Sequence, residues 1–247
     1  MRRGLFAAEE IRDTLYADGG ELQDMNVTYL HHSCFLVESQ RFYYLFDYES
    51  GSLPAMDGTK PIFVFASHRH EDHYNPAIFS LLKAAGMQQI RAVLSDDIEA
   101  SAAVDVLPVG PGMTYELAPQ LRLTTFRSTD EGVAFLLEDG ETLLYHAGDL
   151  HDWVWDEESE AYNAKMTADY QREIASLART LGQREIDVAF VVLDPRQEKD
   201  YDRGLCWFLE NIPVKQVYPM HYWGKPAIIE TFLQEHPQYE LQIQKTE

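Results

Sequence analysis

The chain has 247 residues, of which 45% are hydrophobic and 12% aromatic, and this is enough apolar material for one sizeable core. Its 20 Lys and Arg residues stand against 41 Asp and Glu residues, which gives a net charge of -21. Because nucleic-acid binding depends on basic side chains that neutralise phosphates, this charge argues against nucleic acid and anionic lipid as partners. The two cysteines, Cys34 and Cys206, lie among apolar residues, which is typical of free thiols and not of a disulfide framework.

Residues 1–24 are expected to form a short helical appendage followed by a break at Gly19-Gly20. The acidic, amphipathic residues after Met1 are unlike the apolar core of a signal peptide. No apolar run approaches the roughly 20 residues needed to span a bilayer. We therefore expect a cytoplasmic protein without a membrane partner, and a single domain over residues 25–247. A homo-oligomer is left open.

The next part of the chain is read as short strands rich in β-branched and aromatic residues. The expected strands cover residues 27–31, 34–38, 42–48, 61–66, 91–95, 113–117, 121–127, 133–138 and 142–147. Residues 61–66 form a continuous apolar run, which indicates a strand buried on both faces. A helix is expected to begin with Asn75 as its cap and Pro76 in its first position, and to stop at Gly86.

Helices and strands alternate in the last third of the chain. Helices are expected over residues 163–181, 203–211 and 226–235, with strands over 186–193 and 214–218. Antiparallel strands followed by such alternation indicate an α/β protein with two sheets packed face to face and helices outside.

The segment from Ser67 to His73 is the most informative part of the sequence, because it carries three imidazoles and two carboxylates within six residues. These groups are suitable ligands for zinc, iron or manganese. His68 and His70 lie two apart on an extended segment, so their side chains can chelate one ion. Asp72 and His73 follow where the chain begins to turn and can hold a second ion. The alternative is a polar loop with incidental histidines.

His-X-His-X-Asp-His after an apolar strand resembles the signature of the metallo-β-lactamase superfamily. The resemblance implies a four-layer αββα sandwich with one or two divalent transition-metal ions at one edge, zinc first and manganese or iron as alternatives. It also implies that Asp149 bridges two ions and that His221 completes the second site. The segments that carry it, besides the histidine motif, are Phe46-Asp47-Tyr48, Tyr145-His146-Ala147-Gly148-Asp149 and Pro219-Met220-His221-Tyr222.

Within the superfamily, Leu30-His31-His32-Ser33-Cys34-Phe35 is similar to the branch of lactonase-like and phosphodiesterase-like hydrolases. The activity implied is hydrolysis of an ester, lactone, amide or phosphodiester bond in a small molecule by a metal-activated water. Asp72 and Asp149 are the expected catalytic carboxylates. The alternative is a metal-binding protein of the same fold with a degenerate first site and no hydrolase activity. A nucleic-acid-processing enzyme is disfavoured by the net charge of -21.

The sequence departs from the family at one ligand. A third histidine for the first ion normally comes from the turn before the Gly-Asp segment, but residues 127–131 contain none. Three alternatives follow: Asp130 or Glu131 takes the position, which favours manganese or iron; His151 takes it; or the first site is weak or empty.

Five residues near the expected metals are candidates for binding substrate: His32, His151, Trp153, Asp194 and Arg196. Trp153 can form part of an apolar pocket with Trp155, or both can pack against the next helix. Arg196 is suited to a carboxylate or phosphate, with a structural pair to Asp194 as the alternative. The remaining histidines are expected outside the site: His31 on the opposite face of its strand, His146 as a buried non-ligand and His236 on the surface.

Overall fold

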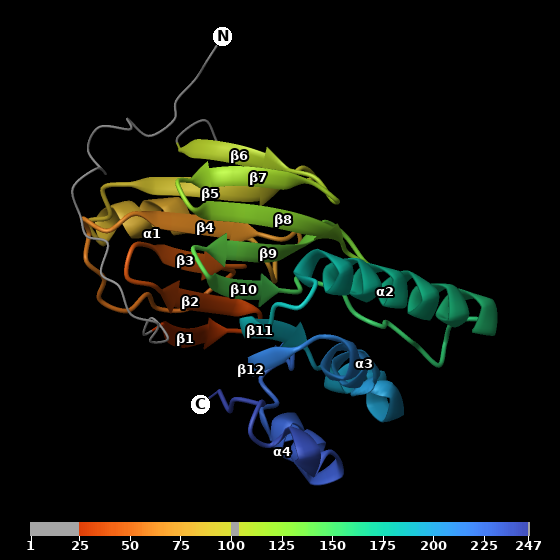
Figure 1. Ribbon diagram of the computed structural model, residues 1–247. Helices are drawn as coiled ribbons and strands as arrows, with labels where there is room; N and C mark the ends of the chain where they lie inside the picture. The colour runs from red at the N-terminus through yellow and green to blue at the C-terminus, as the bar shows by residue number, and fades with distance from the viewer. Residues whose placement is uncertain (1–24, 100–103, 247) are drawn as a thin grey trace.

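Two six-stranded sheets face each other in the computed structural model, which describes residues 25–99 and 104–246 (Figure 1). The expected appendage, residues 1–24, lies outside the described residues. Helices cover the outer faces of both sheets, so that the layers run helix, sheet, sheet, helix. The predicted αββα sandwich is confirmed.

The first sheet has the order β1-β2-β3-β4-β5-β6. Its strands are β1 (Asn26–His31), β2 (Cys34–Glu38), β3 (Tyr43–Phe46), β4 (Ile62–Ala66), β5 (Ile90–Ser95) and β6 (Asp105–Val109). Strands β1 to β3 pair antiparallel, and β3 to β6 pair parallel. The parallel half directs the carboxyl ends of β3, β4 and β5 toward one edge of the sandwich.

The second sheet has the order β12-β11-β10-β9-β8-β7. Its strands are β7 (Thr114–Ala118), β8 (Leu121–Arg127), β9 (Val133–Asp139), β10 (Thr142–His146), β11 (Ile186–Val192) and β12 (Val214–Met220). Strands β7 to β10 pair antiparallel, whereas β10, β11 and β12 are parallel. The loops that leave β10, β11 and β12 therefore leave from the same end of this sheet.

The helices lie on the two outer faces and beside β12. They are α1 (Ile78–Ala84), α2 (Glu160–Leu181), α3 (Arg203–Asn211) and α4 (Ala227–Glu235), with 3-10 turns η1 (Pro195–Asp200) and η2 (Pro237–Tyr239). Helix α1 covers the first sheet, and α2 and α3 cover the second (Figure 1). Among the described residues, no helix combines the length and the apolar character that a membrane crossing requires.

Strand β4 shows why the core forms as it does. Its five residues are all buried, as the continuous apolar run predicted. Phe63 and Phe65 belong to the core between the sheets. Ile62 and Val64 pack in a second core beneath α1. Because side chains alternate along a strand, the unbroken apolar sequence fills both layers.

Two of the differences from the prediction have a clear physical cause. Strand β6 was not predicted. Its fourth residue, Pro108, is unusual for a strand, but it is tolerated here because β6 is an edge strand that, among the described residues, pairs with β5 alone. Helix α1 begins at Ile78 and not directly after Asn75. Asn75 instead caps the preceding turn, where its side-chain oxygen accepts a hydrogen bond from Ala77 N at 3.0 Å.

Candidate metal centre

The loop between β4 and α1 brings the histidine motif to the edge where the parallel strands end. His68 to His70 is followed by a tight turn in which His73 N and Tyr74 N donate to the carbonyl oxygen of His70 at 3.0 and 2.9 Å. The turn divides the motif between two groups of donor atoms. His68 and His70 belong to one group, and Asp72 and His73 belong to the other.

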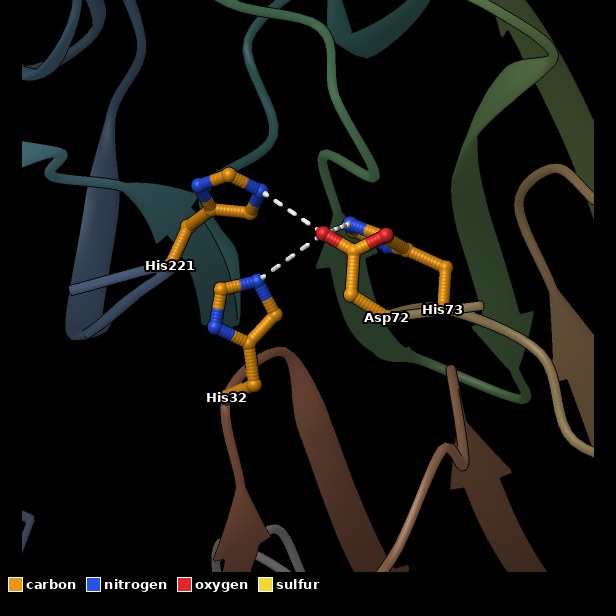
Figure 2. A group of neighbouring side chains, drawn as sticks. All are labelled: His32, Asp72, His73 and His221. Carbon is orange, nitrogen blue, oxygen red and sulfur yellow. Dashed lines mark ion pairs between the residues drawn. The ribbon is translucent and has the colours of Figure 1, made fainter. Parts of the chain in front are cut away.

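The second of these groups consists of His32, Asp72, His73 and His221, each of which offers one donor atom (Figure 2). Asp72 Oδ2 lies 3.5 Å from His32 Nε2 and 3.9 Å from both His73 Nε2 and His221 Nε2. His32 comes from the β1–β2 hairpin, and His221 follows β12 directly. The fold thus joins three segments that are far apart in the sequence.

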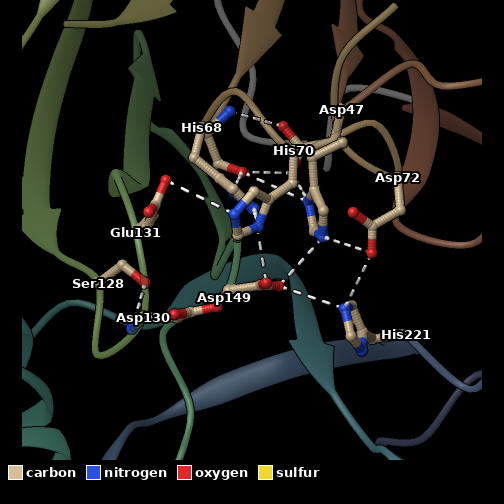
Figure 3. A network of polar contacts seen from close by, with 12 residues as sticks. Asp47, His68, His70, Asp72, Ser128, Asp130, Glu131, Asp149 and His221 are labelled. Carbon is tan, nitrogen blue, oxygen red and sulfur yellow. Dashed lines mark hydrogen bonds and ion pairs between the residues drawn. The ribbon is translucent and has the colours of Figure 1, made fainter. Parts of the chain in front are cut away.

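The first group consists of His68, His70 and Asp149 (Figure 3). His68 Nε2 lies 3.0 Å from His70 Nδ1 and 3.6 Å from Asp149 Oδ2. The other oxygen of the same carboxylate, Asp149 Oδ1, lies 3.1 Å from His73 Nε2 and 3.4 Å from His221 Nε2. Asp149 therefore presents one oxygen to each group, as a bridging carboxylate would.

Two glycines allow the segments to approach so closely. Gly148 precedes Asp149 with φ of +53°, and a Cβ there would lie 2.7 Å from Ser67 Cβ. At Gly132, with φ of +71°, a Cβ would lie 1.9 Å from the carbonyl oxygen of Ser67. Only glycine combines this conformation with this contact.

The donor atoms fit a metal ion by a test that does not depend on sequence similarity. Twelve buried side-chain atoms of the described residues have no hydrogen-bond partner, and four of these converge on the second group: His32 Nε2, His73 Nε2, His221 Nε2 and Asp149 Oδ1. Unpaired buried polar atoms are rare in native proteins because they lose their bonds to water. Two donors bound to one zinc ion at tetrahedral angles stand about 3.4 Å apart, close to the separations observed. The geometry thus supports metal ligation.

The charges of the centre point the same way. Asp47, Asp72 and Asp149 pair with histidines, and in the described part of the chain no Lys or Arg pairs with them. Although burial opposes ionisation, the charges of His73 and His221 hold the pKa of Asp149 well below its usual range. Burial lowers the pKa of His68 to about 4 and also lowers the pKa of His32. These two rings are therefore neutral near pH 7, the form that binds metals.

Two buried carboxylates hold two of the donor rings in place. Asp47, which is fully buried, accepts a hydrogen bond from His73 Nδ1 at 2.7 Å, and it also accepts bonds from the Ser67 backbone and hydroxyl at 2.7 Å. Asp194 Oδ2 lies 3.0 Å from His221 Nδ1. Each carboxylate fixes the tautomer that leaves Nε2 free to face the centre.

The comparisons with known proteins agree with this geometry. The family model described as the beta-lactamase superfamily domain matches residues 26–165, more than half of the chain. The chain belongs to the metallo-β-lactamase superfamily. Among curated proteins, no sequence matches it. The narrower resemblance to lactonase-like hydrolases stays a prediction.

Several solved structures share the fold of this chain at low identity. A metallo hydrolase from Ignicoccus hospitalis, Igni18, is 18% identical with a TM-score of 0.61, over 90% of this chain and 95% of that one. Zn(2+)-bound PqqB from Methylobacterium extorquens is 12% identical with a TM-score of 0.52, over 86% and 84%. CmlA, a diiron β-hydroxylase from Streptomyces venezuelae, is 13% identical with a TM-score of 0.55, over 91% and 53%.

The turn at residues 127–131, where the resemblance implied a third histidine, makes other contacts. Glu131 Oε2 lies 3.6 Å from His70 Nε2, while its other oxygen pairs with Arg69 at 3.0 Å. Asp130 is exposed and lines the pocket beside the centre. Burial and the nearby Asp149 charge raise the pKa of Asp130. Neither carboxylate belongs to a donor group of the described residues, so the first group keeps three donors.

The structure does not bring His151 to either group, although it was a candidate ligand and substrate residue. Its ring is fully buried, its Nε2 lies 2.7 Å from Gln197 Oε1, and it packs on Gly204. The cause is a turn directly after Asp149, where Leu150 N donates to the carbonyl oxygen of Ala147 at 3.0 Å. Burial lowers the pKa of His151 to about 4.

A pocket of about 290 Å³ opens onto both groups. Trp153 is buried, donates from Nε1 to the carbonyl oxygen of Asp149 at 2.9 Å and stacks on Trp155. Arg196 lies over the ring of Trp223, 4.4 Å from its centroid, and pairs with the fully buried Asp194. The lining residues are His70, Asp72, Asp130, Asp149, Trp153, Trp155, Tyr162, Met166, Arg196, His221 and Trp223.

The other histidines lie as follows. His31 is exposed, and His146 is buried with its Nε2 2.9 Å from the carbonyl oxygen of Ser33, both as expected. His236 is half-buried beside Asp202 instead of on the surface. Sequence reasoning missed the anchoring role of Asp47 and the wall formed by Trp223. Asp47 carried a signal, because it stands in the segment that resembles the family.

Proposed function

We propose that the protein is a metal-dependent hydrolase that cleaves an ester, lactone, amide or phosphodiester bond in a small molecule. The observation that carries the proposal is the convergence of unpartnered donor atoms beside an open pocket. Divalent ions bound at such donors lower the pKa of water toward about 7 and polarise the oxygen of the bond that is cleaved.

The chain's own residues would divide the remaining work. Asp149 joins the two donor groups through its two oxygens. Asp72 is about one-third exposed, so a carboxylate oxygen is available to accept a hydrogen bond from water in the pocket. Arg196 lines the same pocket and its side chain is partly exposed, so it can donate to a carbonyl, carboxylate or phosphate oxygen.

The rest of the pocket favours a substrate with an apolar part. Trp155, Tyr162, Met166 and Trp223 supply apolar surface beside the donor atoms, and such surface orients small ligands by excluding water. The volume of about 290 Å³ suits a small molecule.

The test uses protein stripped of metal with a chelator and then reloaded with Zn²⁺, Mn²⁺ or Fe²⁺ singly. We expect at least one ion to restore hydrolysis within a panel of chromogenic esters, lactones, amides and phosphodiesters, and a chelator to remove it again. Full metal occupancy without hydrolysis of any bond class would overturn the proposal and favour a metal-binding protein without this activity.

A further inference from the structure

His32 occupies a position that its residue type makes costly. It is the first residue of the two-residue loop between β1 and β2, where His31 pairs with Cys34. Its φ is +45°, a conformation that favours Gly, Asn or Asp in such loops. A histidine there strains the backbone, and strain of this kind is concentrated at functional sites.

The ring of His32 is buried but not satisfied. Only 4% of its surface is exposed, and Nε2 has no hydrogen-bond partner. The ring packs on two others: its centroid lies 4.3 Å from that of His221 and 4.5 Å from that of Trp223. These ring contacts account for the burial of the carbon atoms, but they do not provide a hydrogen-bond partner for Nε2. That nitrogen faces Asp72 Oδ2 at 3.5 Å (Figure 2).

The hairpin is also tied to the opposite side of the centre. His221 N donates to the carbonyl oxygen of His32 at 3.4 Å, and His221 has a positive φ of 66° itself. Two strained residues from separate sheets therefore fix each other, and their Nε2 atoms both point toward Asp72.

We propose that His32 is a metal ligand, which makes the second group a site of five donors and the tighter of the two metal positions. The donors are His32, His73 and His221 Nε2, Asp72 Oδ2 and Asp149 Oδ1. The first group has only three, and Asp149 is shared between them. Five nitrogen and oxygen donors exceed a tetrahedral shell and suit a first-row divalent ion of higher coordination number. The inference rests on the proposed metal centre.

The experiment uses Co²⁺ as the probe, because its visible absorption is strong in tetrahedral sites and weak at higher coordination. Metal-free wild type, His32→Asn and the control His31→Asn are titrated with Co²⁺ against a chromophoric chelator. Asn tolerates a positive φ, and the exposed His31 is the adjacent matched residue. We expect His32→Asn to bind its first ion at least tenfold more weakly and to absorb more strongly per bound ion, while His31→Asn matches wild type.

A second variant separates ligation from a structural role. Gly adopts the φ of residue 32 without strain, so metal-free His32→Gly should melt close to metal-free wild type. Its rise in melting temperature on adding Co²⁺ should be smaller. A large loss of metal-free stability with an unchanged cobalt-induced rise would overturn the proposal.

The tighter position is tested with His70→Ala, which removes a donor from the first group only. We expect this variant to keep its first cobalt ion at wild-type affinity. Loss of that ion, or equal affinity and absorption in His32→Asn and wild type, would overturn the inference. Because these readouts need no substrate, metal binding without hydrolysis would count against the proposed function alone.

Discussion

The two donor groups differ in how the chain supplies them. His68 and His70 lie two residues apart in the bend that follows β4, so the local sequence places their rings together. The second group takes its donors from the β1–β2 hairpin, the turn of the motif and the end of β12. One half of the centre is thus made by a motif, and the other half is made by the topology of two sheets.

The groups also differ in the side chains that contact the second ring nitrogen of each donor histidine. His73 and His221 each bond to a buried carboxylate, Asp47 and Asp194. His68 Nδ1 has the hydroxyl of Ser67 at 3.0 Å, and His70 Nε2 faces the partly exposed Glu131 at 3.6 Å. Buried carboxylates orient a ring and raise its basicity. The half that depends on the fold is therefore the half whose rings are held more firmly.

The largest effect is expected at Asp149, where the groups meet. Asp149→Ala removes a donor from both, so metal content should fall to one ion or fewer per chain. Hydrolysis should fall by more than about 100-fold, beyond what is typical of changes behind the ligands. Elemental analysis and the assay of the reloaded protein measure the two effects.

Asp130→Ala is the matched control, because it removes a carboxylate from the same pocket but from neither group. Its metal content should equal that of wild type. If Asp130→Ala loses an ion while Asp149→Ala keeps both, the bridging position has been assigned to the wrong residue.

A smaller effect is expected from the groups behind the ligands. Asp194→Asn weakens the bond that orients His221, and metal affinity should fall by about 10- to 100-fold. Glu131→Gln makes the corresponding change beside His70. Because the contact between His70 and Glu131 is exposed, this variant should alter the free energy of metal binding by at most about 1 kcal/mol. Competition with a chelator measures both. Equal losses in the two variants would erase the difference between the groups.

The smallest effect on the centre is expected from His151, which neither group uses. Its pKa in the folded chain is about 4, below the 6.5 of an unfolded chain. As the pH falls from 6.5 toward 4, the unfolded chain binds a proton that the folded chain excludes, so this residue lowers stability in that window.

His151→Gln should remove this contribution. In metal-free protein, its free energy of unfolding should decline less than that of wild type between pH 6.5 and 4, by up to about 3 kcal/mol. Urea denaturation at several pH values measures the difference. The metal content of the variant should equal that of wild type. Loss of an ion would show that His151 binds metal.

Sequence reasoning reached the parts of the molecule that are encoded locally. The apolar run of β4 and the adjacent histidine motif could be predicted because a strand signal and its following loop lie within a few residues. His32 was expected near the centre, but its place among the donor atoms could not be predicted, because it depends on the hairpin meeting the end of β12 across the sandwich. The place of the His151 ring could not be predicted for the same reason: its closeness to Asp149 in the sequence does not reveal the turn that directs the ring toward Gln197.

The distribution of tryptophan has a consequence for the intrinsic fluorescence of the protein. Three of the chain's four tryptophans, Trp153, Trp155 and Trp223, line the pocket, whereas Trp207 lies on α3. Trp153 and Trp223 also contact the ring of His221 edge to face, each with its centroid 5.5 Å from that of the imidazole. Intrinsic fluorescence is therefore dominated by rings that border the donor atoms. Co²⁺ would quench this emission and Zn²⁺ would not, so filling of the centre can be followed in the unlabelled protein.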